Sequence, residues 1–140
     1  MWIVYAFLSA FFASLVAIFG KIGLKNLDST LATSVRSIIM AAFLVCVALT
    51  LKKFQGFSLA SFTGKEWLMI SLSGIAGALS WLFYFFALKN GNATAVSAID
   101  RTSIIFVAVF AALFLGESFG WKAAVGSLFI AGGIFLISLK

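Results

Sequence analysis

The fold is decided by the stretch from Ala93 to Leu115, which reads ATAVSAIDRTSIIFVAVFAALFL. A helix needs about 20 residues to span the hydrocarbon core of a bilayer, and this run is long enough. It is apolar except for Asp100, Arg101 and a few hydroxyl residues, and a charge at membrane depth costs roughly 2.5–3.5 kcal/mol on the insertion scale. Because such charges normally face a bundle interior or a wet cavity, the stretch predicts a membrane helix that lines a polar pathway.

The composition of the whole chain supports a membrane protein. Of its 140 residues, 64% are hydrophobic and only 10% are charged, and no soluble domain of this length buries that much apolar surface. The absence of histidine, zinc-ligand spacing, a phosphate-binding glycine loop and a nucleophile–base pair leads us to expect no enzyme, no metal and no cofactor. The net charge of +6 comes largely from lysines at the ends of apolar segments, which indicates membrane anchoring rather than nucleic-acid binding.

Five runs have the length of a membrane helix, and the chain is predicted to be all-α. The first run is longer than a signal-peptide core and has no basic region before it, so we expect it to stay in the membrane. Gly, Asn and Ser in the short joins indicate where helices end. Glycines at 74, 77, 126, 132 and 133 favour close helix packing inside the subunit over a seam between copies. The sequence therefore predicts one domain, residues 1–140, with helices at about 2–24, 30–51, 67–88, 93–115 and 119–139.

The lysines give almost no orientation signal. Five spans place the N-terminus, the 52–66 loop and the 116–118 turn on one face of the membrane, here called the near face. The near face carries Lys52, Lys53, Lys65 and Lys122, and the far face carries Lys21, Lys25, Lys89 and Lys140. The difference in the number of Lys and Arg residues between the two faces sets the orientation of a membrane protein. With four lysines on each face, the chain can have a weak preference for one orientation, or different copies can insert in opposite orientations.

Three charges lie at similar depth from the far face. Arg36 is about seven residues inside the second helix, and Asp100 and Arg101 are about eight inside the fourth, or roughly 10 Å at 1.5 Å per residue. The far halves of both helices also carry hydroxyl residues, among them Ser97, whereas the near halves are almost wholly apolar. We expect these residues to line one polar vestibule.

Two aromatic residues fall at a comparable depth. Trp81 lies about seven residues inside the third helix, and Tyr84 follows one turn nearer the far face. An aromatic wall beside guanidinium groups suits stacking or cation–π contact with a ligand. The alternative is that Trp81 only packs against helices or lipid.

The vestibule charges also allow two interpretations. Asp100 can form a structural pair with Arg36 or Arg101 that pins two helices together. One carboxylate cannot neutralise two arginines, however, and an uncompensated buried cation is expensive unless water or an anion reaches it. The surplus positive charge in the vestibule favours a ligand with a carboxylate or phosphate. Asp100 is also a candidate proton acceptor.

Several short stretches resemble one EamA-type repeat of the drug/metabolite transporter superfamily. They are Tyr84–Lys89, Ala95–Arg101, Leu113–Glu117 with its Leu-Gly-Glu, and the glycines at 126, 132 and 133, with Arg36 early in the second helix. The resemblance covers essentially the whole chain, and Ile-Asp-Arg-Thr-Ser at 99–103 is similar to the short single-repeat members. The chain departs from the pattern in having no proline, which relatives often carry early in the fourth helix.

The resemblance implies a transporter with an inverted partner. Most relatives carry two five-helix repeats, the second entering the membrane inverted, with the substrate path between them. A single repeat then needs a second copy in the opposite orientation, which the lysine balance permits, or a separate partner repeat. The related four-helix small multidrug resistance proteins use a carboxylate in helix 1, and residues 2–24 contain none, so that mechanism is not transferred.

The sequence thus predicts a secondary transporter of a small, amphipathic, anion-bearing metabolite in the plasma (inner) membrane. The expected partners are the substrate, the bilayer and a second copy of the chain, without nucleic acid. The rival functions are export of lipophilic cations, and a non-transporting or lipid-handling subunit. The candidate substrate-binding residues are Arg36, Trp81, Tyr84, Ser97, Asp100 and Arg101.

Overall fold

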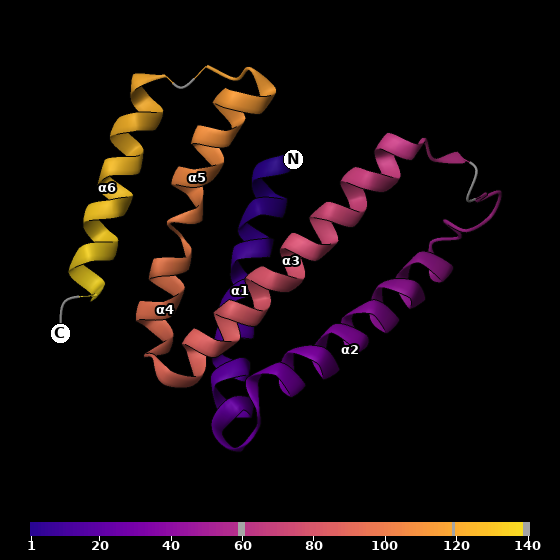
Figure 1. Cartoon of the computed structure of the whole chain (residues 1–140), viewed down its shortest axis with the longest axis horizontal. Helices are drawn as coiled ribbons and strands as arrows, with labels where there is room; N and C mark the ends of the chain where they lie inside the picture. Colours follow the sequence, from indigo (N-terminus) through magenta and orange to yellow (C-terminus); the bar gives the residue numbers. More distant parts are fainter. Residues whose placement is uncertain (59–60, 119, 139–140) are drawn as a thin grey trace. The chain divides into compact units, whose positions relative to one another are not determined.

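A computed structural model of the chain describes residues 1–58, 61–118 and 120–138, and all regular structure in these ranges is helical. Five stretches there are long and apolar enough to cross a membrane: Trp2–Asn26, Ser29–Thr50, Gly64–Asn90, Ala93–Leu115 and Trp121–Ser138. The prediction of an all-α protein with five membrane helices is therefore confirmed. The elements in Figure 1 are α1 (Trp2–Gly23), the 3₁₀ turn η1 (Leu24–Asn26), α2 (Ser29–Thr50), α3 (Gly64–Asn90), α4 (Ala93–Asp100), α5 (Ser103–Phe110), the π-helical turn η3 (Ala111–Leu115) and α6 (Trp121–Ser138).

Side-chain caps fix where three of the helices begin. Asp28 caps α2 by accepting a hydrogen bond of 2.9 Å from the N–H of Leu31, and Asn92 caps α4 in the same way. At α3 the Glu66 carboxylate accepts from the N–H of Thr63 at 2.7 Å, while the Thr63 hydroxyl oxygen accepts from the N–H of Glu66 at 3.3 Å. This capping box starts α3 at Gly64, three residues before the predicted residue 67. The predicted limits of the last helix, 119 and 139, lie outside the described residues.

The fourth span has the predicted bounds, Ala93–Leu115, but a turn interrupts it between α4 and α5. Between α4 and α5, the N–H groups of Arg101, Thr102, Ile104 and Ile105 each donate to the carbonyl three residues back, at 2.9–3.1 Å. Bonds over three residues instead of four tighten the backbone into a 3₁₀ turn. The Thr102 hydroxyl adds a bond of 2.7 Å to the Ile99 carbonyl. A hydroxyl that competes for helix carbonyls bends a helix without any proline.

The same span ends at the Leu-Gly-Glu motif. Gly116 closes the π-helical turn with φ of +68°, in the left-handed region that glycine enters without a steric penalty. In this conformation the N–H groups of Gly116 and Glu117 both donate to the carbonyl of Ala111. The glycine of the motif is therefore required by the way in which the helix ends.

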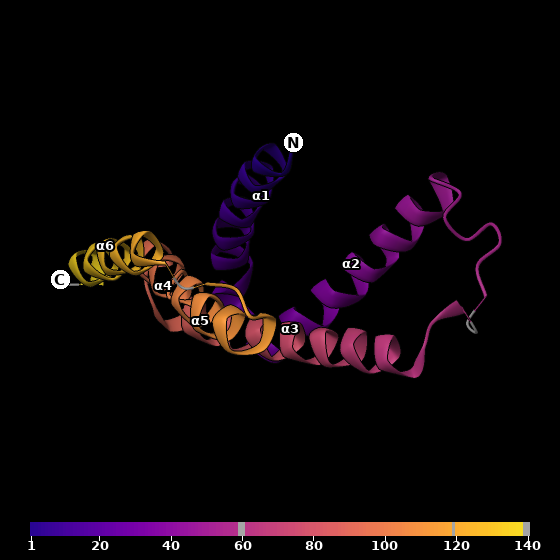
Figure 2. The same ribbon diagram turned by 90° about the horizontal axis from the view of Figure 1, so that it is seen from above.

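The chain forms two compact units, one comprising Ile22–Lys89 and the other Met1–Lys21 with Asn90–Lys140. In the first unit, α2 and α3 approach where α2 begins and α3 ends, and they diverge toward the join between them (Figures 1 and 2). The buried side chains of this unit lie at the closed end: Leu24, Ser29, Thr33, Phe85 and Leu88. In the second unit, α6 packs against α4 and α5.

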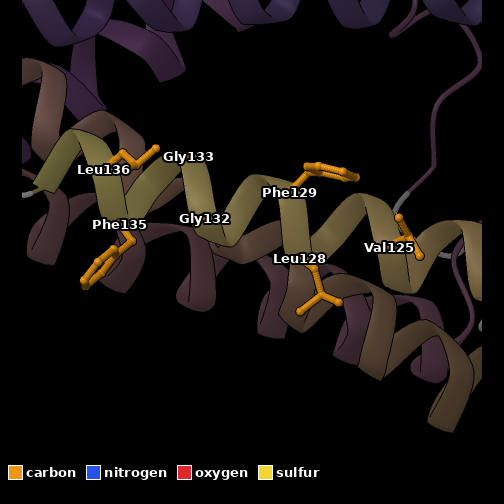
Figure 3. Close-up of a pocket in the computed structure, with 7 residues that line it drawn as sticks. All are labelled: Val125, Leu128, Phe129, Gly132, Gly133, Phe135 and Leu136. Carbon is orange, nitrogen blue, oxygen red and sulfur yellow. The ribbon is translucent and has the colours of Figure 1, made fainter.

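The outer side of α6 carries an open apolar groove of about 770 Å³. Figure 3 shows that, along α6, Val125 and Phe129 lie before Gly132 and Gly133, and Phe135 and Leu136 lie after them. A β-carbon added at any of the five glycines at 74, 77, 126, 132 and 133 would meet no atom within 4 Å. The close packing expected at these glycines is thus not seen within either unit.

Candidate functional site

The candidate site is built around Arg36 on α2 and Trp81 on α3. The guanidinium carbon of Arg36 lies 3.8 Å from the centroid of the Trp81 ring and 5.3 Å from that of Phe85. Both distances are within the range of about 6 Å over which a ring face attracts a cation. The predicted meeting of an arginine and an aromatic wall therefore occurs between two helices of the same unit.

Three aromatic residues of α3 form the wall. Trp81 meets Tyr84 edge to face at 5.5 Å and Phe85 at 6.1 Å between ring centroids, and Tyr84 and Phe85 are 6.2 Å apart. Residues three and four apart share one helix face, so the spacing 81, 84, 85 and 88 presents all these side chains together. Phe85 is 3% exposed and Leu88 is fully buried, which fixes the face of α3 that turns toward α2.

Hydroxyl residues occupy the α2 side of the contact. Ser29 is 1% exposed and Thr33 is 7% exposed, and with Arg36 they follow the i, i+4, i+7 spacing of a single helix face. The Thr33 hydroxyl donates to the Ser29 carbonyl at 2.7 Å, and the Ser37 hydroxyl donates to the Thr33 carbonyl at 2.8 Å. These two hydroxyls are therefore satisfied by their own helix.

Two polar atoms at this contact have no hydrogen-bond partner although they are buried. They are Nη1 of Arg36 and Oγ of Ser29. Leaving a buried donor unpaired costs about 1–3 kcal/mol, and more when the group is charged. The site therefore presents two buried donors on the same face of α2 that no hydrogen bond among the described residues satisfies.

A lysine ties the closed end of the unit together. Lys89, in the last turn of α3, donates from Nζ to the Leu27 carbonyl at 2.9 Å. The pKa of the Asp28 carboxylate lies below its ordinary value, mainly because the N–H of Leu31 donates to it. Desolvation acts in the opposite direction, and further backbone N–H groups and the charge of Lys89 lower the pKa as well. In the other unit, Lys21 donates to the Gly91 carbonyl at 2.8 Å. Two of the lysines counted on the far face thus have a structural role.

The remaining predicted site residues belong to the second unit. Ser97 and Asp100 are half-buried on α4, and Arg101 is exposed at the 3₁₀ turn that follows. The structure brings Arg36, Trp81 and Tyr84 together within the first unit. No cluster of three or more Asp, Glu or Cys side chains suited to a metal occurs in the described ranges.

Phe85 and Ser29 are not among the site residues predicted from the sequence. Phe85 stands four residues after Trp81, so helical spacing from the tryptophan identifies it. Ser29 stands seven residues before Arg36, and the same spacing places it on the arginine's face. Its burial and lack of a partner are visible only in the folded unit.

Comparison with known proteins identifies the family of the chain. Residues 1–139 match the model of the EamA-like transporter family. A Sinorhizobium sp. protein named "Uncharacterized transporter in cobO 3'region" is 38% identical over 138 residues, covering 99% of this chain and 96% of that protein. An "Uncharacterized transporter" of Archaeoglobus fulgidus is 35% identical over 122 residues, covering 86% of this chain and 40% of that protein. No solved structure matches. The chain belongs to the EamA-like transporter family and is a multi-pass membrane protein.

Proposed function

We propose that this transporter moves a small amphipathic metabolite that carries an anionic group, such as an amino acid or an organic acid. The observation that carries the proposal is the Arg36 guanidinium, which is stacked on an aromatic ring and has a buried, unpaired Nη1. A ring face stabilises the cation without neutralising it. The positive charge therefore stays available for an anion.

The aromatic wall supports an amphipathic ligand rather than a bare inorganic ion. Trp81, Tyr84 and Phe85 offer a continuous apolar surface beside the guanidinium, which suits the carbon skeleton of the solute. The same arrangement disfavours export of lipophilic cations, because Arg36 already lies over the Trp81 face and repels a second cation. We further propose that Ser97, Asp100 and Arg101 contribute to the path, with Asp100 as a partner or proton acceptor.

Transport is proposed to proceed by alternating access in an inverted homodimer in the inner membrane, as a secondary transporter without enzymatic chemistry. The Sinorhizobium relative is matched over 96% of its own length, whereas the Archaeoglobus protein extends well beyond the match. A single repeat needs a second, oppositely oriented copy to supply what a two-repeat chain carries within itself. The balanced lysines permit that arrangement.

Counterflow in proteoliposomes tests the substrate class. Purified protein is reconstituted with mixed amino acids or organic acids inside, and uptake of the labelled solute is measured. We expect Arg36→Gln to abolish uptake and Lys122→Gln, a near-face control, to leave it unchanged. If Arg36→Gln is tolerated and Asp100→Asn alone abolishes transport of a lipophilic cation, the cation-export alternative holds instead. If no solute is moved and the double variant Arg36→Gln/Asp100→Asn keeps cellular function, the charges are purely structural.

Reporters fused after Lys140 test the inverted dimer. One reporter is active only outside the inner membrane and the other only inside. Strong signals from both support dual topology and the self-paired dimer. A signal from one alone excludes it and directs the search to an oppositely oriented partner chain.

A further inference from the structure

We infer that Ser29 and Arg36 together form the binding site for a carboxylate group, an inference that rests on the proposed function and deepens it. Ser29 is 1% exposed and its Oγ has no hydrogen-bond partner, and the buried Nη1 of Arg36 has none either. Two unpaired donors on one helix face are the complement of a ligand with two or more acceptor oxygens.

The free hydroxyl of Ser29 follows from its position. Along α2 the hydroxyls of Thr33, Ser34, Ser37 and Thr50 each donate to the carbonyl four residues earlier, at 2.7–2.9 Å. Ser29 is the first residue of α2, so the residue four positions earlier lies outside the helix. The usual local partner of a helical serine is missing, and its donor remains for another acceptor.

The usual direction of long helical side chains favours a ligand that reaches both donors. Such side chains extend back over the preceding turn of their helix, so we expect the guanidinium of Arg36 to extend toward Thr33 and thus toward the end of α2 that carries Ser29. The Thr33 hydroxyl already donates to the Ser29 carbonyl. Of the two buried hydroxyl residues on this face, only Ser29 therefore has a hydroxyl that can donate to a ligand bound by Arg36.

The ligand chemistry follows from shape and charge. The guanidinium carbon lies 3.8 Å from the centroid of the Trp81 ring, so the ring occupies one side of the group, and we expect an anion to bind the N–H groups on another side, as in planar carboxylate recognition. One guanidinium balances one carboxylate. A phosphate carries about −1.5 to −2 charges at neutral pH and would leave part of that charge unpaired at membrane depth. The site is therefore assigned to a monocarboxylate with an apolar skeleton.

Tryptophan fluorescence tests this assignment without requiring transport. The full chain carrying Trp2→Phe, Trp67→Phe and Trp121→Phe keeps Trp81 as its single tryptophan, and the protein is titrated in nanodiscs with benzoate, its neutral isostere benzamide, and inorganic phosphate. We expect a saturable response to benzoate alone. Ser29→Ala should weaken benzoate binding about tenfold, the loss of one charge-assisted hydrogen bond. Ser34→Ala, which removes an exposed and locally bonded hydroxyl, should leave binding unchanged.

The outcomes separate this inference from the proposed function. If Ser29→Ala binds benzoate like the parent while Arg36→Gln does not, the role of Ser29 is overturned and the anion site at Arg36 stands. If benzoate gives no response in any variant, the anion site itself fails. A stronger response to phosphate overturns the carboxylate assignment. Ser29→Thr keeps the hydroxyl, so recovery of binding in that variant excludes a folding defect as the cause of the Ser29→Ala loss.

Discussion

The guanidinium carbon of Arg36 lies 3.8 Å from the centroid of the Trp81 ring, and this contact joins α2 to α3. A carboxylate in the place of Trp81 would have neutralised the arginine. The ring instead attracts the cation and leaves its charge in place. A transporter that binds anions requires a positive charge that the protein itself does not neutralise. The contact of Arg36 with Trp81 therefore serves both the fold and the proposed function.

A double-mutant cycle on this pair should show measurable coupling. We expect Arg36→Met and Trp81→Leu to be non-additive in unfolding free energy by about 0.5–2 kcal/mol, the range for a cation–π contact that is partly desolvated. The matched control pairs Arg36→Met with Trp121→Leu, because Trp121 is 73% exposed on α6 and belongs to the other unit. Reversible denaturation in mixed micelles gives the four free energies. Additivity in the Trp81 cycle would contradict the contact.

Substitutions of two far-face lysines should differ in their effect on the stability of the protein but not in their effect on its orientation in the membrane. Lys89→Met removes the bond of 2.9 Å to the Leu27 carbonyl and should destabilise the protein by about 1 kcal/mol. Lys25→Met removes a charge from the neighbouring turn without losing such a bond, so we expect a change within about 0.5 kcal/mol. Thermal unfolding in detergent measures the difference.

Both variants remove one positive charge from the far face. If orientation depends only on charge count, reporter signals at Lys140 should shift equally in the two variants. A shift in Lys89→Met alone would show that the link between α3 and the Leu27 carbonyl, rather than the charge, guides insertion.

Much of the fold could be predicted because a bilayer permits few solutions. Apolar runs of about 20 residues have to be helices, and counting residues from a helix end placed Arg36 and Trp81 at similar depth before any contact was known. In the structure these two residues are in contact, with 3.8 Å between the guanidinium carbon and the ring centroid. The grouping of Ser97, Asp100 and Arg101 with them stays a prediction.

The features of the fold that were not predicted from the sequence depend on hydrogen bonds rather than on hydropathy. The 3₁₀ turn after Asp100 contains neither proline nor glycine, and it is produced by three-residue backbone bonds and the Thr102 hydroxyl. The early start of α3 was encoded in the capping residues Thr63 and Glu66, which lay in a segment interpreted as a loop. The free donor of Ser29 appears only when its neighbours are seen to be satisfied.

Gly116 should resist substitution by any residue with a β-carbon. Its φ of +68° costs an L-residue roughly 1–2 kcal/mol, although a β-carbon there would meet no atom within 4 Å. We therefore expect Gly116→Ala to lower the unfolding free energy by about 1 kcal/mol through backbone strain alone. Gly64→Ala is the matched control, because Gly64 has equal space and begins a helix at an ordinary φ. Equal effects of the two substitutions would show that the left-handed cap is not what Gly116 provides.

Asp28 should make stability fall in acid. Its pKa is lowered mainly by the hydrogen bond from the N–H of Leu31 at the start of α2, with the charge of Lys89 adding to the effect. Because the folded state binds the proton less tightly than the unfolded chain, the carboxylate stabilises the fold at pH values above its unfolded pKa of about 3.9. That contribution disappears as the pH falls through the lower, folded pKa. We expect the melting temperature of the protein to drop between about pH 5 and pH 3, and Asp28→Asn, which caps a helix equally well without titrating, to drop less. Parallel pH profiles for the two proteins would show that the cap at Asp28 is not coupled to folding.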